Sequence, residues 1–254
     1  MALAIGLAGL PAQVAAQNLI QNGGFETVPA GTTQSYELAV NSTASPTSSL
    51  PYWSTGTNTS GIDCLVYGGV NNMCGSGYLN SGVEATFWVF PGVSPNGGNF
   101  VGGDSASTYA NSISQSVSGL VVGQTYNLTF YQAGAQQKGF SGSTTDQWQV
   151  TFGSSTLQDS TLMHVATESD TAWNSQSMLF TASATTETLT FLALGTPNSE
   201  PPFALLDGVS LISVPEPASI ALLGFGVAGV AGLRRRRTRA SVRAGAGPPD
   251  AVTG

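Results

Sequence analysis

Basic residues are nearly absent from most of this 254-residue chain. Between Gln17 and Val214 there are twelve acidic residues, but a single lysine, Lys138, and a single histidine, His164. Such a surface does not attract the phosphates of nucleic acid or an anionic membrane surface, so we expect neither as a partner of this region. Serine, threonine, asparagine and glycine predominate instead, and their hydroxyl and amide groups suit a hydrated, extracellular setting.

The residue patterns of common catalytic centres are also missing. His164 has no glycine-flanked serine nearby, so a Ser-His-Asp arrangement has no local support. No phosphate loop, dinucleotide fingerprint or metal-binding histidine pair occurs. The acids form many possible pairs, but no motif marks one as the pair of a glycosidase. We therefore predict that the protein is not an enzyme, and keep a secreted glycan-acting hydrolase as an alternative.

The first residues, Met1–Gln17, form an apolar run that ends in small residues, which is typical of a secretory signal peptide. Val14 and Ala16 occupy the small-residue positions for cleavage after Ala16. No basic segment precedes the run, so we expect the true translation start to lie upstream. Residues 1–16 are predicted to be removed on export.

Cysteine is scarce as well, with Cys64 and Cys74 as the only two. A zinc site competes poorly, because the chain supplies only one histidine and no further cysteine. In an exported protein an even count indicates a disulfide. A loop of this size would stabilise the fold by about 2–3 kcal/mol.

A second apolar run lies near the C-terminus, from Ala218 to Leu233, and its 16 residues carry no charge. As a helix the run would be roughly 24 Å long, which is short for a bilayer core of about 30 Å. The arginines that follow can extend to the headgroups, so a slightly thinned membrane would accept it. A buried helix of a soluble domain is the alternative, but it would leave these arginines nowhere to go. We predict a single transmembrane helix at 218–233, followed by a basic tail.

The tripeptide Pro215-Glu216-Pro217 directly precedes this span. Its two prolines keep the backbone extended, which suits a peptide in the groove of a protease at the membrane face. Tripeptide, apolar span and the arginine cluster at 234–239 together resemble the PEP-CTERM sorting signal of bacterial exosortase substrates. Residues 240–254 run longer than this pattern usually does, and their glycine, alanine and proline content predicts disorder.

The resemblance implies processing of 214–239 by an exosortase-type membrane protease. The protein would be anchored transiently in the inner membrane and then delivered to the cell surface or extracellular matrix. The residues implied in sorting are Pro215, Glu216, Pro217, Arg234, Arg235, Arg236 and Arg237.

Alternation of apolar and polar residues predicts β-strands between 17 and 213. Thr125–Phe130 and Gln147–Phe152 alternate strictly, and no amphipathic helix is found. Residues 31–80 are expected to form long loops. We predict an all-β fold, an antiparallel β-sandwich of the jelly-roll kind. Further strands are predicted at Phe87–Phe90, Asn99–Gly102, Ser112–Val117, Gln176–Thr181, Thr188–Leu194 and Ala204–Ile212.

Three segments resemble jelly-roll carbohydrate-binding modules and galactose-binding-like domains. They are the opening Asn18–Glu26, the strand Val122–Phe130 and the closing Leu205–Leu211. The resemblance implies that the first and last strands run side by side and that a carboxylate from each holds a structural Ca²⁺. Here those carboxylates are Glu26 and Asp207, while Gly208 replaces a second aspartate of the family pattern. Two ordinary edge carboxylates are the alternative.

Sugar binding requires exposed aromatic rings, with amides and carboxylates around them. Trp53, Tyr67, Tyr78 and Trp88 lie in polar, loop-like sequence and are the candidates, whereas Trp148 and Trp173 are expected in the core. We therefore predict an exported protein that binds carbohydrate, in particular extracellular polysaccharide. The alternative is a structural biofilm matrix protein without a small ligand.

Overall fold

The computed structural model describes residues 17–38, 49–69 and 86–215. The expected signal peptide, Cys74, Tyr78 and the sorting segment beyond Pro215 lie outside these residues, so the predictions about them stay predictions. The chain divides into two units, Met1–Val214 and Pro215–Gly254, and the fold below is that of the first.

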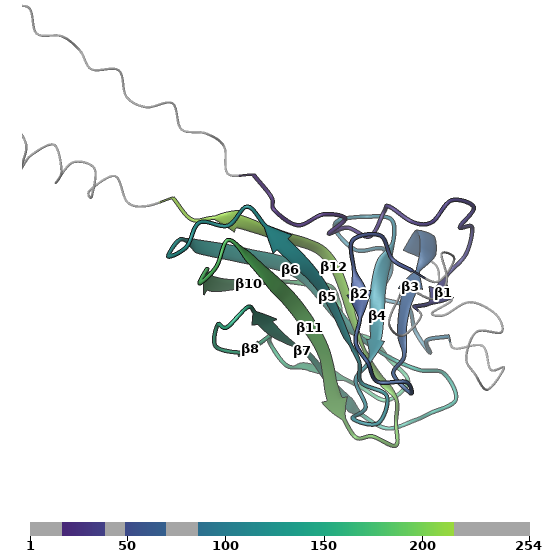
Figure 1. Ribbon diagram of the computed structural model, residues 1–254. Coiled ribbons are helices and arrows are strands. Elements are labelled where there is room, and N and C mark those ends of the chain that lie inside the picture. Colours follow the sequence, from purple (N-terminus) through teal and green to yellow (C-terminus); the bar gives the residue numbers. More distant parts are fainter. Residues whose placement is uncertain (1–16, 39–48, 70–85, 216–254) are drawn as a thin grey trace, which may run out of the picture. The chain divides into compact units, whose positions relative to one another are not determined.

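Two antiparallel sheets form the domain (Figure 1). The first sheet has the order β1 (Tyr36–Glu37), β3 (Asp63–Val66), β4 (Phe100–Asp104), β12 (Pro202–Ser213), β6 (Thr125–Gln136) and β10 (Asn174–Thr181). The second sheet has the order β2 (Ser54–Thr55), β5 (Ser112–Ser118), β11 (Thr186–Thr196), β7 (Thr144–Phe152) and β8 (Gln158–Asp159), and β9 (Met163–Val165) also pairs with β7. Among the described residues, the one helical element is a 3-10 turn at Tyr67–Gly69. The prediction of an all-β sandwich is confirmed.

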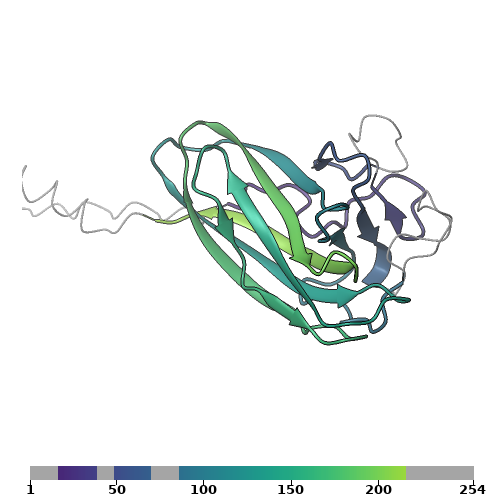
Figure 2. The ribbon, with the colours of Figure 1, turned by 90° about the horizontal axis from the view of Figure 1, so that it is seen from below.

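The core lies between the sheets, where the alternating strands bury one face each. Trp148, Val150 and Phe152 of β7 point inward, and the residues between them are partly exposed. Phe191 of β11 is at the centre of the aromatic packing, with its ring centroid 5.2 Å from that of Phe130 and 6.1 Å from that of Trp148. Figure 2 shows the long strands of the two layers curving past one another. Burial of each such ring stabilises the fold by about 1.5–3 kcal/mol.

A second apolar cluster covers part of the first sheet on its other face. Its members include Phe100 of β4 and Phe203 of β12, which alternate with the residues that point into the sandwich. Residues 132–136 of β6 are therefore buried on both faces. This explains why β6 continues to Gln136, beyond the strictly alternating Thr125–Phe130: where both faces of a strand are buried, apolar and polar residues no longer alternate.

The predicted strand at Phe87–Phe90 is wrong. The structure has only an isolated bridge there, between Phe87 and Gln137. Phe87 is buried because its ring packs on Phe203 at 6.0 Å between centroids. Conversely, the short strands β1, β2 and β3 occur in the region predicted as loops, and Figure 1 shows them gathered on one side of the long strands.

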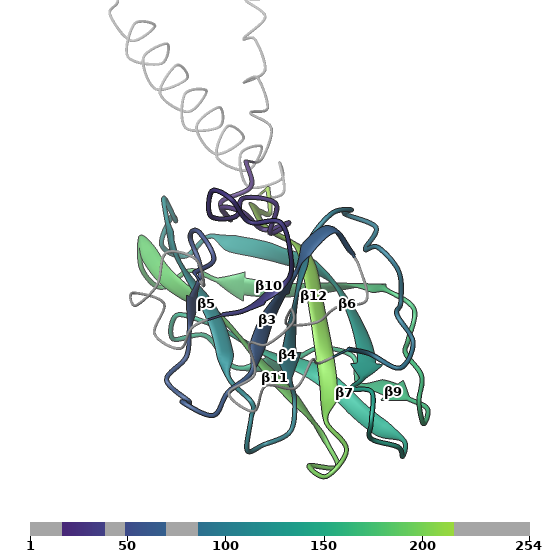
Figure 3. The same cartoon turned by 90° about the vertical axis from the view of Figure 1, so that its right-hand side faces the viewer.

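The opening segment lies beside the closing strand, as the sequence resemblance implied. Leu19 N donates to Leu211 O at 2.9 Å, and Val209 N donates to Gly23 O at 2.9 Å. The approach at Gly23 is so close that a Cβ there would lie 2.0 Å from Val209 O. Strand β12 itself runs between β4 and β6 (Figure 3). The two ends of the domain are therefore tied together.

Candidate functional site

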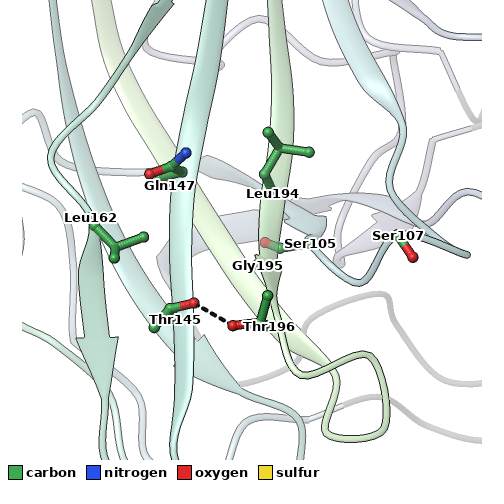
Figure 4. A pocket seen from close by; sticks show the side chains of 8 residues that line it. All are labelled: Ser105, Ser107, Thr145, Gln147, Leu162, Leu194, Gly195 and Thr196. Carbon is green, nitrogen blue, oxygen red and sulfur yellow. Dashed lines mark hydrogen bonds between the residues drawn. The ribbon is translucent and has the colours of Figure 1, made fainter.

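A pocket of about 170 Å³ opens where the ends of β7 and β11 meet the segment after β4 (Figure 4). Hydroxyl and amide groups line it, together with two leucines. Figure 4 shows Thr145 of β7 and Thr196 of β11 facing each other, with their hydroxyl oxygens 2.8 Å apart. The lining residues are Ser105, Ser107, Thr145, Gln147, Leu162, Leu194, Gly195 and Thr196.

Close backbone contacts hold the pocket residues Gly195, Ser105 and Thr145 together. Gly195 N donates to Ser105 O at 2.7 Å. A Cβ on Gly195 would lie 2.4 Å from Thr145 O and 2.8 Å from Ser105 Cβ, so a side chain at this position would force the strands apart. The hydroxyl of Ser105 also bonds to buried groups: it donates to Asp146 Oδ1 at 2.8 Å and accepts from Ala204 N at 3.2 Å.

No ionisable side chain lines the pocket. Burial raises the pKa of Asp146 well above its usual range, although the hydrogen bond from Ser105 opposes this effect. The available chemistry is therefore hydrogen bonding by hydroxyls and an amide beside the apolar surface of Leu162 and Leu194. This combination fits a small, neutral, polyhydroxylated group better than a charged one.

The aromatic residues expected to contact a ligand do not come together. In contrast to the expectation of an open ring, Trp53 is only 4% exposed. Its indole nitrogen donates to Asn22 O at 3.0 Å and its ring packs 5.4 Å from that of Phe25. Tyr67 and Trp88 are half-buried, and Lys138 Nζ lies 6.0 Å from the centre of the Trp88 ring. Trp148 is in the core as predicted, and the half-buried ring of Trp173 packs 5.3 Å from that of Phe100.

Tyr52 is an exposed aromatic residue that the sequence patterns did not single out. Its side chain is 59% exposed, although its neighbour Trp53 is buried. The backbone at Tyr52 has a φ of 73°, which is rare for a bulky residue and costs about 1–3 kcal/mol. No pattern in the sequence distinguishes Tyr52 from Trp53, because both follow Pro51 in the same polar segment.

Glu26 and Asp207 lie near each other and hold the same loop. Asn99 N donates to Glu26 Oε1 at 2.8 Å, and the Asn96 side chain donates to Asp207 Oδ1 at 3.4 Å. Burial raises the pKa of Asp207 to about 7, and the charge of Glu26 adds to this rise, while Ser94, Gly208 and Asn96 oppose it through hydrogen bonds. Asp207 Oδ2 is buried without a hydrogen-bond partner. The structure thus brings the two predicted carboxylates together, and one buried oxygen of Asp207 has no hydrogen-bond donor.

Three other expectations concern single residues or segments. His164 is exposed on β9. Cys64 is buried in β3, but Cys74 lies outside the described residues, so the disulfide stays a prediction. Within the described ranges, no helix has the length and apolar character that a membrane span needs.

Comparison with known proteins identifies two segments. Residues 213–237 match the model of the PEP-CTERM protein-sorting motif. Residues 103–211 match the model of a protein family of unknown function, DUF642. No curated protein matches the chain.

Several solved structures match at low similarity. One is a family 61 carbohydrate-binding module solved with β-1,4-galactotriose: 14% identity and a TM-score of 0.40, with 78% of this chain and 99% of that chain covered. Another is the family 22 xylan-binding domain of Paenibacillus barcinonensis Xyn10C: 14% identity and a TM-score of 0.31, with 53% and 82% covered.

Proposed function

We propose, from the PEP-CTERM protein-sorting motif that residues 213–237 carry, that this protein is exported and then processed by an exosortase-type membrane protease. Residues 218–233 would span the inner membrane until cleavage, with Arg234 and its neighbours on the cytoplasmic side. Cleavage would release the β-sandwich to the cell surface or the extracellular matrix. The motif match is the observation that supports this part of the proposal.

Replacing Pro215-Glu216-Pro217 by three alanines tests the sorting step. Export should proceed, but the unprocessed chain should accumulate in the membrane fraction, as mass spectrometry of its C-terminus would show. Pro248 and Pro249 lie beyond the motif, so replacing both by alanine is the matched control and should leave processing unchanged. Normal processing of the triple variant would reject the sorting mechanism.

For the exported domain we propose binding of a neutral polysaccharide at the pocket between β7 and β11. The observation that carries this proposal is the lining of hydroxyls, one amide and two leucines without any charge. Gln147 would bond to sugar hydroxyls, while Leu162 and Leu194 would contact an apolar sugar face. That the domain is not an enzyme stays a prediction.

Affinity electrophoresis of the full chain in gels containing β-1,4-galactan, xylan or dextran would test this proposal. Gln147→Ala should abolish the retardation that one of these glycans causes. Gln149→Ala changes the next partly exposed position of the same strand, outside the pocket, and should retain it. Equal loss in both variants would place binding elsewhere. Wild-type protein that none of the glycans retards would favour a structural matrix protein without a small ligand.

We also propose a structural Ca²⁺ between Glu26 and Asp207. The unpartnered Oδ2 of Asp207 and the adjacent Glu26 carboxylate supply oxygen ligands of the kind that Ca²⁺ prefers. The described residues contain no group of three acidic, histidine or cysteine side chains that could hold a metal. The remaining ligands would therefore be backbone carbonyls and water, near Asn22 and Thr27.

A further inference from the structure

Asp63 of β3 places its carboxyl group in the space between the two sheets. The residue is 1% exposed, and neither of its carboxyl oxygens has a hydrogen-bond partner. A Cβ built on Gly103 would lie 3.0 Å from Asp63 Oδ1, 3.1 Å from Ala193 Cβ and 3.3 Å from the Trp148 ring. Asp63 therefore reaches from the first sheet toward apolar side chains of the second.

Asp146 of β7 reaches across the same gap in the opposite direction. It is fully buried, and its Oδ2 has no hydrogen-bond partner. This oxygen lies 3.2 Å from the Cβ position of Gly134 in β6, which belongs to the first sheet. Asp104, also buried, lies at the end of β4 opposite Phe203 of β12, on the other face of the first sheet, and its Oδ1 accepts from Ala106 N at 2.8 Å. Both sheets thus place a carboxyl group in one shared interface.

Among the described residues, no basic side chain is buried with these groups. Besides Asp104, the charged group that acts on Asp63 is another acid, Glu37 of the neighbouring strand β1. In the part of the chain that the structure describes, Lys138 and His164 are the only basic side chains, and both are exposed. Ionised carboxylates here would be isolated charges in an apolar interior, which is too costly for a stable fold.

Burial, more than any other cause, raises the pKa values of this group. The pKa of Asp63 rises to about 7, with Asp104 and Glu37 adding to the effect of burial. The pKa of Asp104 also rises to about 7, although the hydrogen bond from Ala106 opposes it. Glu37 is only half-buried, and burial raises its pKa to about 7 as well.

We propose that Asp63, Asp104 and Asp146 are neutral carboxylic acids in the folded protein, and that Asp63 and Asp146 make the contact between the two sheets dependent on bound protons. The contact between the sheets is most stable in acid and becomes less stable as the surroundings become neutral or alkaline. Folding at mildly acidic pH takes up one proton for each of these groups, and unfolding returns it to the solvent. The device regulates the stability of the domain and does not depend on which glycan it binds.

The pH dependence of unfolding has a defined sign. Between about pH 4 and pH 7 the unfolded chain has lost these protons while the native state keeps them, so stability falls as pH rises. For each group that keeps its proton in the native state, the folding equilibrium constant falls by up to about tenfold for every unit that the pH rises in this interval. Urea unfolding of the full chain at several pH values measures this slope.

Asparagine imitates the neutral acid without the proton. Asp63→Asn and Asp146→Asn should each flatten the slope by up to about tenfold per pH unit. Asp159→Asn changes an exposed carboxylate on β8 and should leave the slope as in the wild type. A wild-type slope that both interior variants keep unchanged would overturn the proposal.

Proton release provides a test that needs no variant. Unfolding the wild-type chain in unbuffered urea at about pH 6 should release about three protons or more, which a pH-stat counts. Infrared spectra of the native protein at that pH should contain the band of protonated carboxyl groups. If unfolding released no protons, the interior carboxyl groups would not be protonated in the native state. If the pH slope of unfolding disappeared on adding Ca²⁺ or a chelator, a metal ion and not a proton would occupy the interior.

Discussion

Two groups of carboxylates in this domain have pKa values raised to a similar level but lie in different surroundings. Burial raises the pKa of both Asp207 and Asp63 to about 7. Asp207 accepts hydrogen bonds from Gly208 N and Asn96 and stands beside the exposed Glu26. Asp63 has no hydrogen-bond donor at either oxygen and faces Ala193 and Trp148.

The difference lies in what neutralises each group. Beside the buried Asp207 the carboxylate of Glu26 is exposed, so the proposed Ca²⁺ would approach from that side and complete its shell with backbone oxygens. Asp63 is enclosed between the sheets near Ala193 and Trp148, so the occupant proposed there is a proton. The two groups should therefore respond to different reagents, the first to Ca²⁺ and the second to pH.

Gly23→Ala should have the largest effect, because it separates the end where Glu26 and Asp207 meet. The new Cβ would lie 2.0 Å from Val209 O, and a backbone atom cannot move aside cheaply. We expect a loss of about 3 kcal/mol in the free energy of unfolding, together with loss of any Ca²⁺ response. The pH slope of the interior group should survive, and urea titrations with and without Ca²⁺ would measure both. Unchanged stability would mean that the opening segment is not held against β12.

Adding Ca²⁺ at about a hundred times its dissociation constant should stabilise the wild type by roughly 2.7 kcal/mol. For a domain of this size the melting temperature would rise by several degrees, and a chelator would reverse the rise. Glu26→Gln or Asp207→Asn should remove the response, whereas Asp63→Asn should keep it. A melting curve that ignores both Ca²⁺ and chelator would remove the ion from the proposal.

Gly103→Ala should have the smallest effect, and it tests the surroundings of Asp63 between the sheets. Its methyl group would crowd Asp63 Oδ1, Ala193 and Trp148 at 3.0–3.3 Å. We expect a cost of about 1–2 kcal/mol from overpacking. The cost should be greater at pH 8 than at pH 5, since an ionised Asp63 needs room for water. Equal cost at both pH values would indicate that the carboxyl does not ionise there.

Alternation predicted the strands that have one polar face. Thr125–Phe130 and Gln147–Phe152 lie within β6 and β7, and their inward residues are those expected. The pattern failed where both faces are buried, as in residues 132–136, and where a loop such as Phe87–Phe90 is apolar because it covers the sheet. Tertiary packing creates these environments, so a local pattern cannot report them.

The sites were less predictable than the fold. Glu26 and Asp207 were found because they lie in recognisable opening and closing segments. The pocket draws Ser105, Gln147 and Leu194 from distant parts of the chain, and no spacing connects them. Trp53 was expected to contact a ligand, yet its bond to Asn22 O holds it in the core, while the neighbouring Tyr52 is exposed. Nothing in the sequence around Asp63 distinguishes a buried acid from a surface one.

Strand β12 leads into the sorting motif and is also flanked by β4 and β6. The residue that follows β12 is held as well, because Val214 N donates to Thr125 O at 2.9 Å and the Gln124 side chain donates to Val214 O at 2.6 Å. Inter-strand hydrogen bonds lie perpendicular to the strands, so a pull along β12 loads both ladders together in shear. A domain tethered through this strand would resist mechanical extraction until many bonds break at once.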